Sequence, residues 1–251
     1  MKTRIITGAV MTAVLIPTLI FSDTPIFVIM LALFAFIGEY EMLHCLGLEK
    51  NIAISLPAYI LAVGLPVGAR YITNGQFMQY AFVAIAICFL WMLAAYTFSK
   101  GNVTLEQAGG AATGCVYVAV AFAAIVLLRD IADTGKYVYM LIFIGAWITD
   151  TFAYFTGMLF GKHKLIPEIS PKKTIIGFIG GIVTNVVFFI VFNAVYCSFM
   201  TKKGVPMGVN WFATILVGMV CAILGTLGDL TASTLKRQLN IKDYGDIMPG
   251  H

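Results

Sequence analysis

The chain has 251 residues, of which 60% are hydrophobic and only 11% are charged, and its formal net charge is +4. A soluble domain carries roughly a quarter charged residues, so this composition excludes an ordinary water-soluble enzyme, and we expect no nucleic-acid partner. Apolar stretches of about 20 residues recur along the whole chain, which is the length that a helix needs to span a bilayer. The sequence therefore predicts an all-α, polytopic membrane protein.

The apolar runs predict about eight transmembrane helices in a single bundle. The first run follows Lys2 and Arg4 and resembles a signal peptide, but no convincing cleavage site follows it, so we expect it to remain as a membrane helix. In chain order the predicted helices cover 5–21, 25–44, 52–69, 79–98, 109–128, 137–160, 176–200 and 210–230. We divide the bundle into N-terminal helices, 1–135, and C-terminal helices that carry the polar motifs, 136–251. The five cysteines are scattered without a CxxC spacing, which indicates neither disulfides nor a metal site.

The distribution of lysine and arginine predicts which helix ends face the cytoplasm. With the N-terminus inside, eleven of the 16 fall on the cytoplasmic side. Five fall outside, namely Arg70, Arg129, Lys136, Lys202 and Lys203. This asymmetry favours a cytoplasmic N-terminus. An even number of helices then places the polar segments 161–175 and 231–251 on the cytoplasmic side as well.

Two aspartates occupy unusual positions for a membrane protein. Asp150 is expected about three turns from the inner end of its helix, and Asp229 is expected to end the last helix. Because an acid within a bilayer span is costly, each is a candidate functional residue. The alternative is an interhelical hydrogen bond or a side chain at the boundary that reaches toward water.

The last predicted helix continues into a polar segment, GDLTASTLKRQ. Asp229, Ser233, Lys236 and Arg237 follow one another at i, i+4, i+7 and i+8, so they line one face of a helix. A carboxylate that holds Mg²⁺, with Lys and Arg that neutralise phosphate oxygens, suits a phosphate ligand. Alternatively, the two cations touch anionic lipid head groups, which leaves Asp229 and Ser233 unexplained.

The segment GKHKLIPEISPKKTIIGFIGG packs four lysines into twelve residues. We expect Pro171 to form a turn, and Lys172 and Lys173 to begin the next helix. Together with Ser170 and Thr174, backbone N–H groups at such a helix start make an anion site. The glycines that follow allow this helix to approach a neighbour closely: Gly177, Gly180 and Gly181.

These segments resemble the signatures of the phosphatidate cytidylyltransferases, or CDP-diacylglycerol synthases. The stretch DTFAYFTGMLFGKHKLIPEISPKKT, from Asp150 to Thr174, is similar to that family throughout. The C-terminal signature matches at Ser233, Lys236, Arg237, Lys242, Asp243, Gly245, Pro249, Gly250 and His251. The resemblance covers about 150–251, and the N-terminal helices agree with the family only in being hydrophobic.

The resemblance implies an enzyme that transfers a cytidylyl group from CTP to phosphatidate on the cytoplasmic side of the inner (plasma) membrane, with Mg²⁺ as cofactor. It implies catalytic roles for Asp229, Ser233, Lys236, Arg237, Lys242 and Asp243, with Asp229 as metal ligand. It implies substrate-binding roles for Ser170, Lys172, Lys173, Thr174, Asp150, Tyr154 and His251. A homodimer is one option for the assembly. Since a phosphate monoester is already an ionised nucleophile, such a site mainly positions its substrates and neutralises charge.

The chain departs from the family pattern in three places. Ile176 and Ala232 stand where the family usually has Glu. The family motif also continues beyond the position of His251 with two glycines and an Asp-Arg-x-Asp segment that contributes to the metal site. We therefore expect the chain to be a fragment that binds Mg²⁺·CTP weakly and turns over slowly or not at all, or else a degenerate, inactive relative.

Several other functions are compatible with parts of the pattern. Another CTP-dependent lipid-phosphate transferase or a lipid kinase would use the same chemistry. In a transporter, Asp150 would lie on an ion path, but paired polar groups and broken helices are then expected near the bilayer midplane. Here the polar residues gather at the predicted cytoplasmic boundary. Glu39 and Glu41 are candidates to line the site, although an interfacial position explains them equally well.

Overall fold

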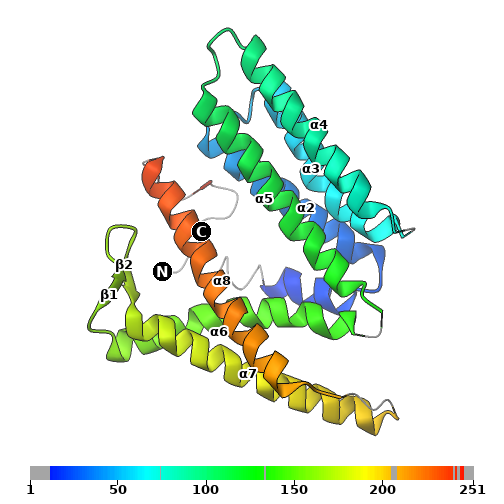
Figure 1. Ribbon diagram of the computed structural model, residues 1–251, viewed down its shortest axis with the longest axis vertical. Helices are drawn as coiled ribbons and strands as arrows, with labels where there is room; N and C mark the ends of the chain where they lie inside the picture. Colours follow the sequence, from blue (N-terminus) through cyan, green and yellow to red (C-terminus); the bar gives the residue numbers. More distant parts are fainter. Residues whose placement is uncertain are drawn as a thin grey trace. The chain divides into compact units, whose positions relative to one another are not determined.

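The computed structural model describes residues 12–73, 75–132, 134–204, 208–239, 241 and 244–245. Within these residues, seven helices are long and apolar enough to cross a membrane (Figure 1). They are α2 (Pro25–Cys45), α3 (Ile52–Tyr71), α4 (Phe77–Phe98), α5 (Leu105–Arg129), α6 (Gly135–Phe160), α7 (Ile175–Lys202) and α8 (Trp211–Gln238). Residues 12–20 are also helical, whereas 5–11 of the first predicted span lie outside the described residues. The predicted polytopic helical fold is confirmed.

Two helix boundaries differ from the prediction for identifiable reasons. Helix α5 begins at Leu105 because Thr104 and Gln107 form a capping box, in which Thr104 Oγ1 accepts from Gln107 N–H at 3.1 Å and Gln107 Oε1 accepts from Thr104 N–H at 3.0 Å. Helix α8 continues to Gln238, since no glycine or proline interrupts it after Asp229. Asp229 therefore ends only the apolar span, and the polar segment after it continues the same helix, as its spacing predicted.

The connection between α6 and α7 contains a β-hairpin that the sequence did not predict. Strand β1 (Lys164–Ile166) pairs antiparallel with strand β2 (Ser170–Thr174), with Lys164 opposite Thr174. Pro171 thus lies in a strand and not in a turn, which a two-stranded sheet tolerates because each strand has a free edge. Lys172 and Lys173 likewise belong to β2 and not to the first turn of α7, which begins at Ile175.

Contacts divide the chain into two units, each described by itself. Unit 1 comprises Met1–Lys136 and Ile241–His251, and unit 2 comprises Tyr137–Asn240. In unit 1, α3 packs against α2, α4 and α5. In unit 2, α7 packs against α8, where Asn185 Nδ2 donates to the Gly218 carbonyl oxygen at 2.8 Å and Asn193 Nδ2 donates to Thr214 Oγ1 at 2.9 Å. Interhelical hydrogen bonds of this kind are each worth roughly 1 kcal/mol in a membrane.

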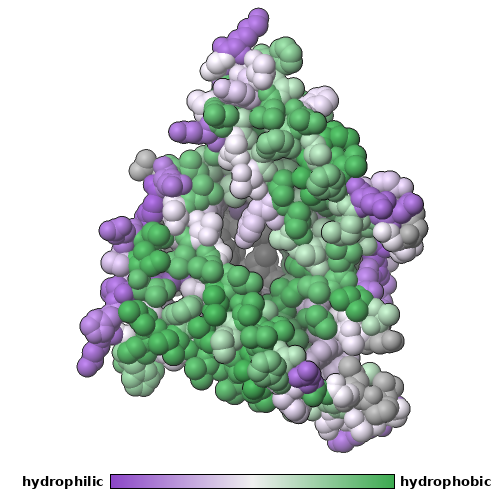
Figure 2. All heavy atoms as spheres, viewed as in Figure 1, coloured by the Kyte–Doolittle hydropathy of each residue, from purple (hydrophilic) through white to green (hydrophobic). Residues whose placement is uncertain are grey.

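Hydrophobic side chains cover much of the helical surface. Figure 2 shows hydrophobic residues over most of the visible face of the described helices. Large apolar side chains such as Phe82, Phe98 and Phe212 are mostly exposed. Soluble monomers rarely expose contiguous apolar surface on this scale. The surface is therefore that of helices that face lipid.

One end of unit 1 is held together by ion pairs around Asp23. Its carboxylate oxygens accept from Arg129 Nη2 at 2.5 Å and from Lys136 Nζ at 2.6 Å. Arg70 and Arg129 also pair with Asp130. Asp23 precedes α2, and Arg70 lies at the end of α3. Arg129 and Asp130 lie at the end of α5, and Lys136 lies at the start of α6. Three of the five cations predicted for the outer side, Arg70, Arg129 and Lys136, therefore lie at the same end of unit 1. This is what helices that cross the membrane in alternating directions require.

The Asp23 network predicts a pH-dependent contribution to stability. Asp23 lies outside the membrane-spanning helices, and its hydrogen bonds to Lys136 and Arg129 hold the pKa of its carboxyl below the usual range. Because the folded-state pKa is lowered, the stabilisation is complete above the ordinary carboxyl pKa of about 4 and is lost as the pH falls through the folded-state value. We expect Asp23→Asn to lower the melting temperature in detergent near neutral pH. The loss should be small, on the order of a degree or two, because the Asp23 side chain is 61% exposed.

The measurement is a thermal unfolding series for both proteins from about pH 6 down to about pH 3, where the native carboxylate becomes protonated. The difference in melting temperature should shrink toward the acid end. A difference that stays constant over this range would show that the substitution acts through packing and not through the charge of Asp23.

The orientation in the membrane stays a prediction that cysteine labelling can test. Lys164 lies in β1, before α7, and Lys202 is the last residue of α7. In a cysteine-free chain, Lys164→Cys and Lys202→Cys should react with a membrane-impermeant maleimide from opposite sides, because α7 spans the bilayer between them. Lys2→Cys should react from the same side as Lys164→Cys. Labelling of the two lysine positions around α7 from one side would exclude the predicted topology.

Candidate active site

A pocket of about 570 Å³ in unit 2 gathers polar residues of the segment 161–175 together with both candidate aspartates, Asp150 and Asp229. Its walls come from α6, the hairpin, the start of α7 and the middle of α8. The polar lining residues are Asp150, Tyr154, Lys164, Ser170, Lys172, Lys173, Thr174, Thr226 and Asp229. Apolar side chains, including Phe178 and Met158, complete the lining. The volume is within the range of small-molecule sites.

An ion pair joins the hairpin to α8 inside this pocket. Lys173 Nζ lies 2.5 Å from Asp229 Oδ2, and the two side chains are 24% and 49% exposed. Two turns farther along α8, Arg237 Nε donates a long hydrogen bond of 3.5 Å to the carbonyl oxygen of Ile169, in the turn of the hairpin. These contacts confirm that the two polar segments lie at the same end of their helices and meet there.

Asp150 faces the same pocket from α6. Asp229 and Lys173 line this pocket together with it. The site therefore combines two carboxylates from different membrane helices with an ammonium group from the hairpin. This arrangement offers ligands for a cation and a donor for an anion within one cavity.

Close packing of α6 against α7 positions Asp150 beside the hairpin. A methyl group added at Gly177 would lie 2.6 Å from the carbonyl oxygen of Ala153, and one at Gly181 would lie 3.0 Å from that of Thr149. Gly180 is pressed in the same way against a threonine side chain of α6. No side chain fits at these contacts, so the predicted close approach of this helix is confirmed and its partner is α6.

Thr174 forms the joint between β2 and α7. It is only 5% exposed, and its hydroxyl accepts a hydrogen bond from the N–H of Gly177 at 3.1 Å. This N-cap satisfies one of the unpaired donors at the start of the helix. Thr174 thus holds the end of the strand that carries Lys173, in addition to lining the pocket.

Several predicted residues lie away from the pocket or beyond the described part of the chain. Ser233, Lys236 and Arg237 continue along α8 past Asp229, and none of them lines the pocket. Ile176, where the family usually has Glu, lies in the first turn of α7 and is exposed. Ala232 lies in α8 between Asp229 and Ser233. The predicted site residues outside the described residues are Lys242, Asp243 and His251.

The structure also adds residues that the sequence did not single out. Lys164 lines the pocket because the register of the hairpin places it opposite Thr174. Its position in the lysine-rich segment indicated a cation near an anion site, but only the strand pairing shows that this lysine faces the pocket. Gly157, Gly161 and Thr226 also line the pocket, and nothing in their sequence pattern indicated this.

The two glutamates of α2 belong to unit 1. Glu39 is fully buried, so its side chain is surrounded by packing within unit 1. Neither of its carboxylate oxygens has a hydrogen-bond partner among the described residues. Glu41 lies against Gly245, where an added methyl group would be 2.9 Å from Glu41 Cγ. The C-terminal part of α2 therefore contacts the described part of the C-terminal motif.

Comparison with known proteins gives a consistent result over the whole chain. The sequence pattern of the cytidylyltransferase family matches residues 2–251. A phosphatidate cytidylyltransferase of Bacillus subtilis (strain 168) is 30% identical over 257 residues, which cover all of this chain and 90% of the relative. The enzyme of that name from Staphylococcus haemolyticus is 31% identical over 260 residues, covering all of this chain and 91% of the relative. One from Staphylococcus aureus (strain COL) is 30% identical over 256 residues, with the same coverage.

Proposed function

Because this multi-pass membrane protein belongs to the cytidylyltransferase family, we propose that its pocket in unit 2 transfers the cytidylyl group of CTP to phosphatidate. A phosphate oxygen of phosphatidate forms a bond to the α-phosphorus of CTP. The bond from that phosphorus to the oxygen bridging to the β-phosphate breaks, so the products are CDP-diacylglycerol and pyrophosphate. The observation that carries the proposal is the meeting of Asp150, Asp229 and the lysines of the hairpin in one cavity.

The charges in the pocket suit this reaction better than acid–base chemistry. Phosphatidate enters as an ionised nucleophile, so little proton abstraction is needed. Lys164, Lys172 and Lys173 line the cavity and supply ammonium groups that neutralise phosphate oxygens. Apolar residues of the same lining, such as Phe178, suit the lipid end of the substrate. In this proposal CTP comes from the cytosol, phosphatidate comes from within the bilayer, and the protein resides in the inner (plasma) membrane.

Asp229 and Asp150 are the residues that would hold Mg²⁺ in this pocket. The ion is commonly bound by one or two carboxylates together with substrate phosphates, and two carboxylates here face one cavity from different helices. Among the described residues, no cluster of three or more acidic, histidine or cysteine side chains could hold a metal alone. The ion would therefore bind together with the triphosphate, and it would supply positive charge to the phosphate groups.

The test uses CTP labelled at either its α- or its γ-phosphorus, added to membranes that contain the protein. The proposal predicts that the α-label enters the lipid fraction, that this depends on added phosphatidate, and that the γ-label appears in pyrophosphate. Transfer of the γ-label to lipid would instead identify a CTP-dependent lipid kinase. Entry of neither label, from a protein that is folded in the membrane, would contradict the proposal and favour an inactive relative. The homodimer stays a prediction.

A further inference from the structure

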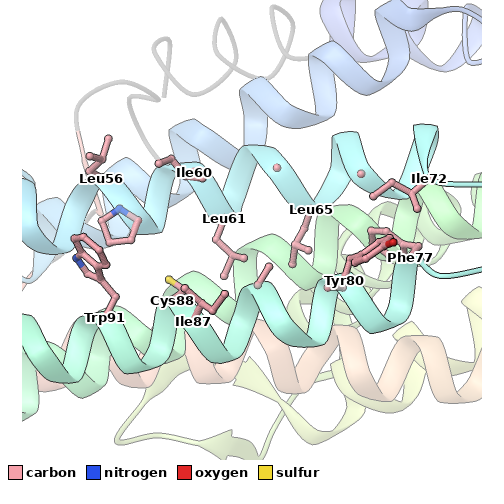
Figure 3. A pocket seen from close by; sticks show the side chains of 15 residues that line it. Leu56, Ile60, Leu61, Leu65, Ile72, Phe77, Tyr80, Ile87, Cys88 and Trp91 are labelled. Carbon is pink, nitrogen blue, oxygen red and sulfur yellow. The ribbon is translucent and has the colours of Figure 1, made fainter.

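A second cavity lies in unit 1, between α3 and α4. It is a groove of about 470 Å³, and Figure 3 shows Leu61 and Leu65 of α3 directed toward α4, with Ile87 and Cys88 nearest to Leu61. Gly64 forms part of the wall, and no atom lies within 4 Å of the position that a Cβ would occupy. The two helices therefore enclose a hollow lined by apolar groups.

Aromatic side chains bound this α3–α4 groove at both ends. Trp91 Nε1 donates to the Ala53 carbonyl oxygen at 2.9 Å, so this indole bridges α4 and α3. At the opposite end, Phe77 and Tyr80 lie beside Ile72 (Figure 3). Tryptophan and tyrosine are enriched at the two membrane interfaces. The groove therefore follows the hydrocarbon region along the helices.

The dimensions of the groove identify the kind of molecule that fits. Its lining extends from Leu56 of α3 to Ile72, the residue that follows this helix, which corresponds to about 24 Å at 1.5 Å per residue. This length exceeds the roughly 15 Å that one leaflet contributes to a bilayer core of about 30 Å. An α-helix of the same length and about 10 Å in diameter occupies roughly 1,900 Å³. The groove is smaller than this, so a single extended chain fits inside it and a whole helix of a second copy does not.

The two ends of the groove differ in charge. Lys50 precedes α3 and Lys100 follows α4, and both side chains are exposed. Since α3 and α4 are consecutive antiparallel helices, both lysines belong to the end that Trp91 bounds. Glu49, beside Lys50, is paired with His44. At the opposite end, Arg70 is engaged by Asp130 and by a backbone carbonyl.

We propose that the α3–α4 groove binds one acyl chain of an anionic glycerophospholipid, with the lipid phosphate beside Lys50 and Lys100. The apolar walls match the chain, and the two exposed cations match the headgroup. Lysine near an anionic membrane surface contributes about 1 kcal/mol, a preference of about fivefold for each residue. The groove shares no lining residue with the pocket in unit 2, so this lipid is bound separately from the substrate. The inference does not rest on the proposed function.

Trp91 provides a direct reporter, because it lies in the groove. Trp147→Phe and Trp211→Phe leave it as the only tryptophan. The full-length chain is reconstituted in phosphatidylcholine vesicles that contain brominated phosphatidylglycerol or brominated phosphatidylcholine, each over the same series of increasing fractions. We expect the anionic lipid to quench Trp91 fluorescence at several-fold lower concentration. Lys50→Gln combined with Lys100→Gln should remove this preference.

A second variant tests the apolar part of the site. Gly64→Leu should fill the hollow and reduce quenching by both brominated lipids. Gly109→Leu is the matched control, because Gly109 is an exposed helical glycine of α5 with no atom near its Cβ position, and it should leave the quenching unchanged. Equal quenching by the two lipids, unaffected by the lysine substitutions, would overturn the proposal. So would weak quenching by both lipids together with cross-linking of Trp91 to a second copy. If Gly64→Leu does not fold, the lysine variant alone decides.

Discussion

Asp229→Asn is expected to lower cytidylyl transfer by about a thousandfold or more while the protein remains folded. Charge neutralisation by a metal at a phosphoryl site is worth several kcal/mol, and each 1.4 kcal/mol is about tenfold in rate. Asp229 supplies one of the two carboxylates in the pocket and is also paired with Lys173. Because its side chain is about half exposed, an amide is tolerated there. The measurements, made on a chain extended by the two glycines and the Asp-Arg-x-Asp segment of the family motif, are incorporation of label from CTP and the melting temperature of the purified protein.

The matched control for this substitution is Glu168→Gln. Glu168 lies in the turn of the hairpin, is exposed and does not line the pocket. The Glu168→Gln substitution also removes one negative charge at this end of unit 2. It should change the rate of cytidylyl transfer by less than about twofold, as expected for a solvated surface charge. If Asp229→Asn retained nearly full activity, Asp150 and then the pair Glu39 and Glu41 would be the next carboxylates to test.

Lys173→Ala is expected to impair the use of CTP much more than the use of phosphatidate. We expect kcat/KM for CTP to fall by about 10- to 100-fold, since a charge-assisted hydrogen bond contributes roughly 1.5–3 kcal/mol. Lys173 lies on β2, where its ammonium group already points into the pocket toward Asp229. The experiment varies each substrate separately at saturating concentrations of the other.

Lys162→Ala serves as the control, because Lys162 is an exposed lysine just before the hairpin and does not line the pocket. It should leave both kcat/KM values within about twofold of the unsubstituted chain, since an exposed charge is largely screened. An equal loss for CTP and phosphatidate in Lys173→Ala would indicate a general electrostatic surface and not a nucleotide contact.

The bilayer makes the helical part of this fold predictable. Every span must satisfy its own backbone hydrogen bonds over about 30 Å of hydrocarbon, so hydrophobic runs alone locate the helices. Their ends depend on local chemistry that is easier to misjudge, such as the capping box at Thr104. The hairpin was missed because a segment rich in lysine and proline has little intrinsic preference for strands. Its pairing depends on the neighbouring helices.

The site was predictable as a set of residues but not as a geometry. Helical periodicity correctly placed Asp229 on a helix with Ser233, Lys236 and Arg237. Only the first of these lines the pocket, because the hairpin and α6 meet α8 at that turn. The pairing of Lys173 with Asp229 joins positions far apart in the chain, and no local pattern contains that information. The burial of Glu39 depends in the same way on packing within unit 1.

The ion pair between Lys173 and Asp229 has a consequence for the order and strength of ligand binding. Each partner is the natural counter-ion of a different ligand, an anion for the lysine and a cation for the aspartate. An anion that draws Lys173 away leaves Asp229 available, and a cation that occupies Asp229 releases Lys173. The two ligands then enhance each other's affinity by the same factor, as thermodynamic linkage requires. A pair of neighbouring side chains thus makes the site selective for a metal–triphosphate complex over either component alone.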